Sequence, residues 1–226
     1  KKFERKTLDS ADTIICVSSY CKKILENQFG IPCDKVIYNG VDPGFFKRNN
    51  DIVKNNKKIT LFFSGNHTRM KGFDVVLEIA TRLKNDVQII LSSGFKQNRI
   101  EKLSSNIISV GTLSRNEMVY YYNKSDIFLF PTRLEGCSLT VTEAMASEMP
   151  IIATNCASLP EQVDHGKGGM LCKMDDVDDF VKNIQYISED EELRYQMGRY
   201  NRRKVLEMFA DTQMAENYIS EYQRLV

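Results

Sequence analysis

The sequence predicts an α/β fold in which helices cover both faces of a parallel sheet, the Rossmann-like doubly wound arrangement. Two observations support this fold class. Short apolar runs rich in β-branched and aromatic residues alternate with helical segments along the whole chain. Several runs, such as IICV, IFLF and IIAT, are apolar at nearly every position, which is typical of a strand buried on both faces.

The expected strands follow one another at regular intervals along the chain. They are Thr13–Val17, Lys35–Tyr38, Ile59–Ser64, Val87–Ser92, Ile107–Val110, Ile127–Phe130, Pro150–Thr154 and Gly169–Cys172. Helix starts lie between them. Ser114 with Glu117 three residues later predicts a capping box, and Ser188 with Glu191 predicts another.

The end of the chain, Thr212–Val226, predicts one more helix. Its expected apolar face consists of Ala215, Tyr218, Ile219, Tyr222 and Leu225. A domain boundary is predicted between Tyr38 and Asn56, because NGVDPGF is turn-rich and KRNNDIVKNNKK is polar without periodicity. Residues 1–40 are too few for a domain and are expected to be the tail of a preceding one, followed by a Rossmann-like domain over 41–208 and the helix over 209–226.

Composition excludes several classes of protein. The 226 residues are 42% hydrophobic and 27% charged, which is not the composition of a disordered, collagen-like or coiled-coil chain. The 31 Lys and Arg residues balance 30 acidic ones, so the basic excess of a nucleic-acid-binding protein is missing. No apolar run approaches the roughly 18 residues that cross a bilayer.

Cysteine usage bears on metals and on the cellular compartment. The six cysteines are Cys16, Cys21, Cys33, Cys137, Cys156 and Cys172. They contain no C-x-x-C pair, and the chain has only two histidines, so a zinc site is not expected. An acidic run, Asp175–Asp179, stands where a helix starts and is interpreted as capping. Scattered single cysteines are typical of reduced thiols, which predicts a cytoplasmic protein.

The first candidate site is SGNHTRMKG, which joins a predicted strand to a helix at Ser64–Gly72. Ligands of parallel sheets bind beyond the carboxyl ends of the strands, and a helix N-terminus offers free amides to an anion. Gly65 permits close backbone approach, and Arg69 and Lys71 add charge suited to a diphosphate. Ordinary connecting loops have similar compositions, so this segment alone does not establish a site.

A second strand–helix junction is PTRLEGCSLTVTEAMA, residues 131–146. Glu135 lies in the loop and Glu143 in the helix, with seven residues between them. This spacing predicts two carboxylates facing one crevice, and ionised carboxylates are strong acceptors for hydroxyl groups. A phosphate held by amides and Lys71, flanked by hydroxyl-rich groups on the two glutamates, fits a sugar–diphosphate–ribose ligand.

This motif resembles the Glu–seven residues–Glu motif of retaining nucleotide-sugar glycosyltransferases of the group 1 (family 4) type, which have two facing Rossmann-like domains in the GT-B fold. SADTIICVSS and VIYNGVDPGFF are similar to the family's passage from acceptor domain to donor domain. SGNHTRMKGFDVVLEIA is similar to its Gly–basic loop, and residues 107–154 are similar to its donor-binding core. The resemblance implies the C-terminal half of a GT-B protein, with residues 41–208 binding the donor and residues 209–226 packing back toward the N-terminal domain.

The resemblance also implies residue roles. Glu143 corresponds to the ligand of the ribose hydroxyls, Glu135 to the acid that contacts the donor sugar, and Lys71 to the cation on the diphosphate. The backbone from Gly111 to Leu113 corresponds to the base-binding edge. The amides expected to cradle phosphate and sugar are those of Gly136, Cys137, Ser138 and Leu139.

One position departs from the family pattern. The family commonly has Arg directly after the loop glycine, as one of two cations at the diphosphate, and here that position is Asn66. Either Arg69 reaches the site from three residues further on, or the site has lost a charge.

The implied function is transfer of a sugar from a nucleoside-diphosphate sugar, with UDP expected, to a saccharide or lipid-linked acceptor with retention of configuration, in glycan or polysaccharide biosynthesis. Cations and amides would stabilise the leaving diphosphate, so no metal or other cofactor is expected. Acceptor groups would come from the N-terminal domain, so this chain alone is expected to be inactive. A lipid-linked acceptor would place the full-length protein at the inner face of the cytoplasmic membrane.

Two other functions stay open. Asn66 leaves room for a catalytically silent scaffold subunit that binds a nucleotide sugar. Another GT-B enzyme, such as a sugar-nucleotide epimerase or a glycogen-synthase-like enzyme, would use the same donor site. Nucleotide binding without turnover would favour the scaffold, and epimer formation without an acceptor would favour the epimerase.

Overall fold

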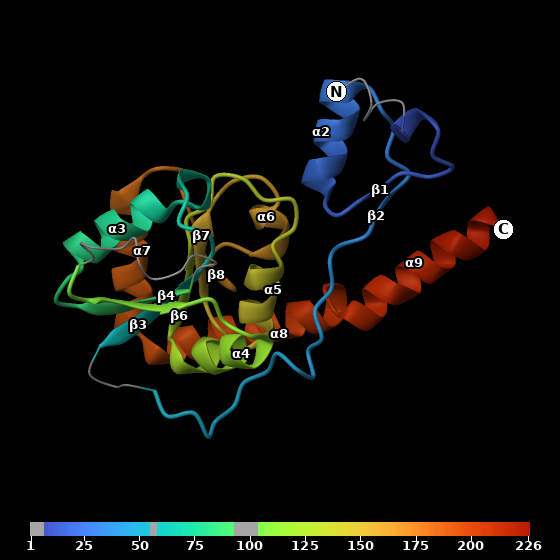
Figure 1. The fold of residues 1–226 in the computed structure, drawn as a ribbon. Coiled ribbons are helices and arrows are strands. Elements are labelled where there is room, and N and C mark those ends of the chain that lie inside the picture. Colours follow the sequence, from blue (N-terminus) through green and yellow to red (C-terminus); the bar gives the residue numbers. More distant parts are fainter. Residues whose placement is uncertain (1–6, 55–57, 93–103) are drawn as a thin grey trace.

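The computed structural model describes residues 7–54, 58–92 and 104–226. The start of the predicted N-terminal tail (1–6) and part of the predicted linker (55–57) lie outside the described residues. Figure 1 shows a main domain (residues 41–208) built on one sheet, and beside it a smaller N-terminal unit (residues 7–38). The last helix extends from the main domain along the side of that unit.

Over the residues that the structure describes, the sheet of the main domain has six strands, all parallel. They are β3 (Ile59–Ser64), β4 (Val87–Ser92), β5 (Ile107–Gly111), β6 (Ile127–Phe130), β7 (Ile151–Thr154) and β8 (Gly169–Cys172). Their spatial order is β5-β4-β3-β6-β7-β8. The chain therefore moves outward from β3, returns to its other side at β6 and moves outward again, which confirms the doubly wound prediction. The switch point of such a sheet lies between β3 and β6.

Helices cover both faces of the sheet and enclose two cores. On one face lie α3 (Phe73–Arg82) and α7 (Val177–Glu189), and on the other lie α4 (Arg115–Lys124) and α5 (Leu139–Ala146). Successive side chains of β3 point to opposite faces of the sheet and so enter both cores. Leu61 and Phe63 belong to the first core, and Phe62 belongs to the second. The long helix α8 (Glu191–Met208) contributes to both cores.

The N-terminal unit is one strand–helix–strand motif. Its strands β1 (Ile15–Cys16) and β2 (Lys35–Val36) pair in parallel, and α2 (Ser19–Phe29) connects them. The chain then crosses to the main domain at Gly40, where an added Cβ would lie 2.6 Å from Asp211 Cα. Only glycine allows this close approach to the start of the last helix, α9 (Asp211–Leu225).

The predicted linker is only partly exposed. Val41 exchanges backbone hydrogen bonds with Phe209 and Asp211, and Phe46 is buried in the second core with its ring 6.2 Å from that of Tyr122. Residues 47–51, which follow, are exposed. The turn-rich part of the segment is therefore packed structure, and its polar part alone is an exposed loop.

One predicted capping box is wrong. Ser188 lies inside the last turn of α7, and Asp190, the single residue between the two helices, caps α8 by accepting the N–H of Leu193 at 2.9 Å. The box at Ser114 and Glu117 is confirmed. Asp190 caps α8 in place of Ser188 because α7 extends past Ser188 to Glu189.

The C-terminal helix is present, but four of the five residues of its predicted apolar face are exposed, and Tyr218 is half-buried. Ile219 and Tyr222 are 54% and 60% exposed, whereas the buried residue is Glu221. The Glu221 carboxylate accepts a hydrogen bond from Lys35 Nζ at 2.7 Å, which ties α9 to β2. Among the described residues, no helix is long and apolar enough to span a membrane.

Candidate functional site

Two loops meet at the switch point of the sheet. The β3–α3 loop (residues 65–72) contains a short 3-10 helix at Arg69–Lys71, and the β6–α5 loop (residues 131–138) leads into α5. Gly72 has a positive φ of 71°, and a Cβ there would lie 1.9 Å from the Pro131 carbonyl oxygen. The N–H of Arg133 donates to the Met70 carbonyl at 2.9 Å. A glycine at residue 72 therefore lets the two loops touch, a requirement that the sequence analysis missed.

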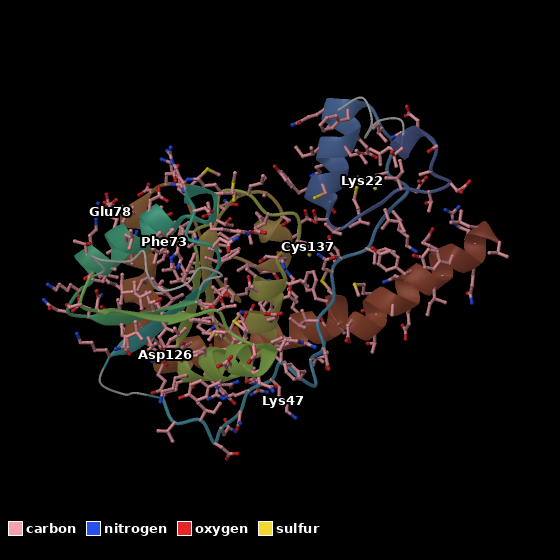
Figure 2. The ribbon with its side chains drawn as sticks, viewed as in Figure 1. Lys22, Lys47, Phe73, Glu78, Asp126 and Cys137 are labelled. Carbon is pink, nitrogen blue, oxygen red and sulfur yellow. The ribbon has the colours of Figure 1, made fainter. Side chains whose placement is uncertain are left out.

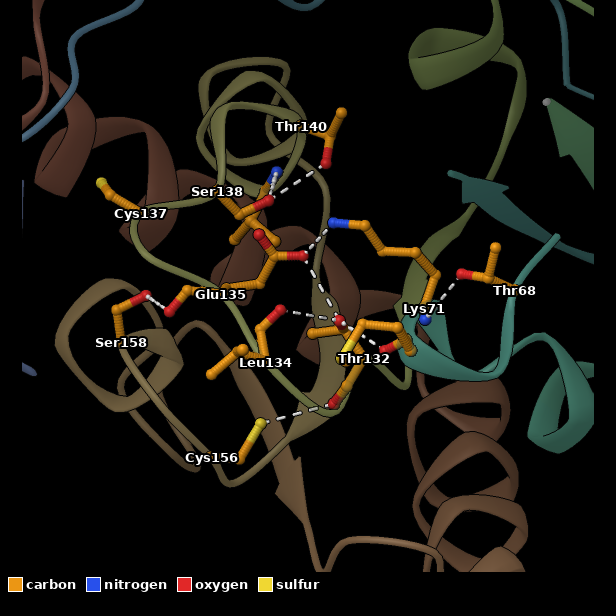
Figure 3. Close-up of polar contacts among 12 residues, drawn as sticks. Thr68, Lys71, Thr132, Leu134, Glu135, Cys137, Ser138, Thr140, Cys156 and Ser158 are labelled. Carbon is orange, nitrogen blue, oxygen red and sulfur yellow. Dashed lines mark hydrogen bonds and ion pairs between the residues drawn. The ribbon is translucent and has the colours of Figure 1, made fainter. Parts of the chain in front are cut away.

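The contact between the loops brings two predicted site residues together. Lys71 Nζ forms an ion pair with Glu135 Oε1, and the Thr132 hydroxyl lies 3.3 Å from the same oxygen (Figure 3). The Lys71 side chain is 31% exposed and that of Glu135 only 12%. Lys71 also lies over the Phe130 ring, with Nζ 5.8 Å from the centroid, and a Cβ on Gly65 would lie 3.8 Å from Lys71 Cβ. The cation is thus held beside Gly65 by a mostly buried carboxylate.

The N-terminus of α5 directly follows the β6–α5 loop, which carries Glu135. Ser138 caps the helix by accepting the N–H of Val141 at 3.4 Å. The predicted amide cradle needs one correction, because the N–H of Ser138 already donates to Gln162 Oε1 at 3.0 Å. Across the described part of the chain, no acceptor is found for the N–H groups of Leu139 and Thr140, the first two of the helix. These amides and the helix dipole are available to an anion.

Glu143 lies inside α5 and is fixed by a different partner. The hydroxyl of Tyr122, which is fully buried on α4, donates to Glu143 Oε2 at 2.8 Å. Burial raises the pKa of Glu143 above its ordinary value, and the Tyr122 hydrogen bond and the charge of Arg115 oppose that shift. Glu143 is therefore a desolvated carboxylate whose charged form would be stabilised by additional hydroxyl donors. The sequence analysis assigns Tyr122 no role at the site, and no local pattern in the sequence reveals its hydrogen bond to Glu143.

The other predicted residues lie in the loop after β3 and at the end of β5. Asn66 is exposed, and the Arg69 side chain is 83% exposed, with its Nε 4.0 Å from an Asp74 carboxylate oxygen. Gly111 ends β5 with a positive φ of 72°, and a Cβ there would meet nothing within 4 Å. Leu113 is half-buried against the second core. The edge near Gly111 is thus open.

Arg133 supports the site and was missed by the sequence analysis. Its guanidinium donates to both carboxylate oxygens of Asp74 at 2.8 Å, pairs with Asp175 at 2.5 Å and donates to the Arg69 carbonyl. These partners raise the pKa of Arg133 and engage its charge with carboxylates. Arg133 therefore joins the loops after β3, β6 and β8, and this role depends on partners far away in the sequence.

The acidic run Asp175–Asp179 lies at the start of α7. Asp176 caps α7 by accepting the N–H of Asp179 at 3.1 Å, as predicted. Within residues 7–54, 58–92 and 104–226, no three His, Cys, Asp or Glu side chains are grouped so that they could hold a metal ion.

Comparison with known proteins places this site in a family. Residues 45–204 match the model of glycosyl transferases group 1, and residues 1–45 match that of glycosyltransferase family 4. The chain is 29% identical over 170 residues to an uncharacterized glycosyltransferase of Haemophilus influenzae, a match that covers 71% of this chain and 48% of the relative. It is 27% identical over 161 residues to the N,N'-diacetylbacillosaminyl-diphospho-undecaprenol alpha-1,3-N-acetylgalactosaminyltransferase of Campylobacter jejuni, covering 69% of this chain and 42% of that protein. The chain thus spans about half the length of the curated relatives it matches.

Solved structures show the same fold at low identity. Sucrose-phosphate synthase from Thermosynechococcus elongatus superposes with a TM-score of 0.89 at 20% identity, over 99% of this chain and 61% of that one. Anabaena Alr3699/HepE, solved in complex with UDP and glucose, superposes with a TM-score of 0.84 at 16% identity, over 94% of this chain and 63% of that one. These likenesses confirm the fold as that of GT-B glycosyltransferases. Because one family model matches most of its length, the chain belongs to the group 1 glycosyl transferases.

Proposed function

We propose that this chain binds a UDP-sugar and that the protein transfers the sugar to a saccharide or lipid-linked acceptor, with retention of configuration, in glycan biosynthesis. The observation that carries the proposal is the Lys71–Glu135 pair, which stands at the switch point of the sheet beside the N-terminus of α5. UDP is favoured because a structural neighbour, Anabaena Alr3699/HepE, was solved with UDP and glucose. Retention is favoured by the resemblance of the Glu135–Glu143 spacing to the retaining family.

The chemistry of the proposed reaction is stabilisation of a leaving group. When the bond between the anomeric carbon and the diphosphate oxygen breaks, negative charge develops on the diphosphate. Lys71 and the free amides of Leu139 and Thr140 would oppose that charge without reorganising. An arriving diphosphate would compete with Glu135 for Lys71, and the released carboxylate would then accept hydrogen bonds from the sugar hydroxyls.

The nucleoside would occupy the other part of the site. Glu143, held by Tyr122, would accept the ribose hydroxyls, and each such bond to a charged acceptor is worth about 1.5–3 kcal/mol. The open edge from Gly111 to Leu113 would receive the base. This arrangement needs neither a metal ion nor another cofactor.

A second candidate function is nucleotide-sugar binding without transfer. The observation that favours it is the placement of Asn66 and Arg69, since Asn66 carries no charge and Arg69 lies in solvent beside Asp74. A diphosphate clamp with one lysine would bind a donor more weakly than one with two cations. Turnover by the protein in the presence of saccharide acceptors would exclude this candidate.

Metal independence is the most direct test of the proposed clamp. We expect UDP to bind the chain with the same affinity, within about twofold, in EDTA and in Mg²⁺, because Lys71 and backbone amides supply the positive potential. Calorimetric titration in both buffers measures this. Binding that EDTA abolishes would refute the metal-free clamp, and a chain that binds neither UDP nor UDP-glucose would refute the proposed function.

A further inference from the structure

The carboxylate of Glu161 caps a helix from a distant part of the chain. Glu161 lies in α6 (Leu159–Gln162) of the main domain. The N–H of Ser19 donates to its Oε2 at 2.8 Å, and the N–H of Tyr20 donates to its Oε1 at 2.7 Å. These are the first two amides of α2, which have no acceptor within their own helix and favour a negative charge. One side chain of the main domain thus accepts hydrogen bonds from the first two amides of the helix in the N-terminal unit.

A third donor reaches the same carboxylate from the C-terminal end of the N-terminal unit. The hydroxyl of Tyr38, just after β2, donates to Glu161 Oε2 at 2.9 Å. Burial raises the pKa of Tyr38, so the phenol stays a donor at neutral pH. The Tyr38 ring also packs edge-on against Phe209, with centroids 5.2 Å apart. Glu161 therefore joins two separate parts of the N-terminal unit, the start of α2 and the residue Tyr38, to the main domain.

The same short helix supports the β6–α5 loop. Gln162, fully buried next to Glu161, accepts the N–H of Ser138 at 3.0 Å and donates to its carbonyl at 2.8 Å. The hydroxyl of Ser158, the residue before α6, donates to the Glu135 carbonyl at 3.1 Å. α6 therefore holds the N-terminal unit through one residue and the β6–α5 loop through its neighbours.

The β6–α5 loop also contacts α2 of the N-terminal unit and Asn39, the residue that follows the unit, directly. Asn39 Nδ2 donates to the Cys137 carbonyl at 3.2 Å, and Cys21 Sγ lies 3.8 Å from the Gly136 carbonyl oxygen. Figure 2 shows Cys137 at the side of the main domain that faces the crossover segment. A displacement of the N-terminal unit would therefore disturb the backbone at residues 136 and 137, next to Glu135.

We propose that Glu161 is a positioning residue that fastens the N-terminal unit against the β6–α5 loop and so links the docking of that unit to donor binding. The first half, the fastening, stands on the contacts alone. The second half, the link to the donor, rests on the proposed function. Linkage is reciprocal: if the fastened unit favours donor binding, then a bound donor must strengthen the fastening by the same factor.

The fastening is tested by amide hydrogen exchange, followed by NMR on the 226-residue chain without ligand. In Glu161→Gln the side-chain volume is kept, but the amide NH₂ cannot accept a hydrogen bond from the second backbone N–H. We expect the amides of Ser19 and Tyr20 to exchange at least about tenfold faster, the loss expected for a hydrogen bond to a charged group. The matched control is Glu216→Gln on the exposed side of α9, which should leave these rates unchanged.

A second variant removes a donor instead of the acceptor. Ser19→Pro places proline at the first position of a helix, where its ring is tolerated, after Ser18, whose backbone is extended (φ −162°, ψ 160°). The ring carbon would occupy the position of the hydrogen bond and displace the carboxylate. The amide of Tyr20 should then exchange faster while α2 stays helical. Unchanged exchange of Tyr20 in both variants would overturn the fastening.

The link to the donor is tested by repeating the exchange with saturating UDP-glucose. In the unsubstituted chain we expect the ligand to slow exchange at Ser19 and Tyr20 by about threefold or more, and in Glu161→Gln to slow it little. UDP-glucose should also bind Glu161→Gln several-fold more weakly. Equal slowing in both proteins would overturn the link and leave the fastening intact. If the unsubstituted chain bound no UDP-glucose, the proposed function and the link would both fall, and the ligand-free rates would still decide the fastening.

Discussion

Replacing Lys71 by methionine should weaken the binding of both UDP and UDP-glucose about 100-fold, or roughly 3 kcal/mol. Methionine keeps much of the side-chain volume but removes the cation proposed to hold the diphosphate. It also leaves Glu135, only 12% exposed, as an unpaired negative charge next to the arriving phosphates. Removing one partner of a desolvated charge pair between a protein and its ligand, here Lys71 and the diphosphate, typically costs about 2–5 kcal/mol. Calorimetric titration of the variant with either ligand measures the loss.

The control for Lys71→Met is Lys182→Met on the exposed face of α7, which should bind UDP as the unsubstituted chain does. If Lys71→Met folds poorly, the double variant Lys71→Met, Glu135→Gln removes the stranded charge and should recover stability without recovering affinity. Binding of UDP within about threefold of normal by either Lys71 variant would show that Lys71 does not hold the diphosphate.

Replacing Glu143 by glutamine should weaken UDP and UDP-glucose alike, by about 10- to 100-fold, because a charged acceptor for the ribose hydroxyls is lost. The same substitution should raise the thermal stability of the ligand-free chain at neutral pH. Burial raises the pKa of Glu143 above its ordinary value of 4.5, so ionised Glu143 costs the folded state free energy. The Tyr122 hydroxyl can still donate to the glutamine oxygen.

The pH dependence follows from the direction of that shift. Between the ordinary pKa of 4.5 and the raised pKa of the folded state, the folded chain binds more protons than the unfolded chain. The contribution of Glu143 to stability therefore decreases as pH rises through this window and stays unfavourable above it. Thermal unfolding at several pH values should show the stability gain of Glu143→Gln disappear below the window. A variant that lost stability at neutral pH, or that bound UDP normally, would contradict the assignment.

The strands were predicted well because their signal is local. Ile59–Ser64, Val87–Ser92 and Ile127–Phe130 match the structure to the residue. Each contains at least three consecutive apolar residues, Leu61–Phe63, Ile89–Leu91 and Ile127–Phe130, and such a run is typical of a strand buried on both faces. The alternation of strands with helices then leaves few topologies, since parallel crossovers have one hand.

The helix ends and the buried face of the last helix were harder to predict. Two residues can compete to cap one helix, and either face of a helix can contact a neighbouring element. Ser188 has the residues of a capping box, but Asp190 stands closer to the start of α8 and takes the role. The apolar stripe of α9 is a correct helical pattern, yet the face that contacts β2 is the one carrying Glu221, which pairs with Lys35. Local periodicity does not report which face meets a neighbour.

Part of the candidate site could be predicted from the sequence and part could not. Lys71 and Glu135 were expected together from the two strand–helix loops and the family pattern, and the structure joins them in an ion pair. The roles of Tyr122, Arg133 and Glu161 depend on hydrogen bonds to residues far away in the chain. No spacing within a single segment encodes such partners, so only the fold reveals them.

The measurement that tests the donor site most directly is a set of calorimetric titrations of Glu135→Gln and Glu143→Gln, each with UDP and with UDP-glucose. Glu143→Gln should weaken both ligands. Glu135→Gln should leave UDP as tight as before or tighter, because it removes the carboxylate that competes for Lys71, yet it should reduce the affinity for UDP-glucose relative to UDP about tenfold. Small and equal effects in all of these titrations would contradict the site, even with the fold correct.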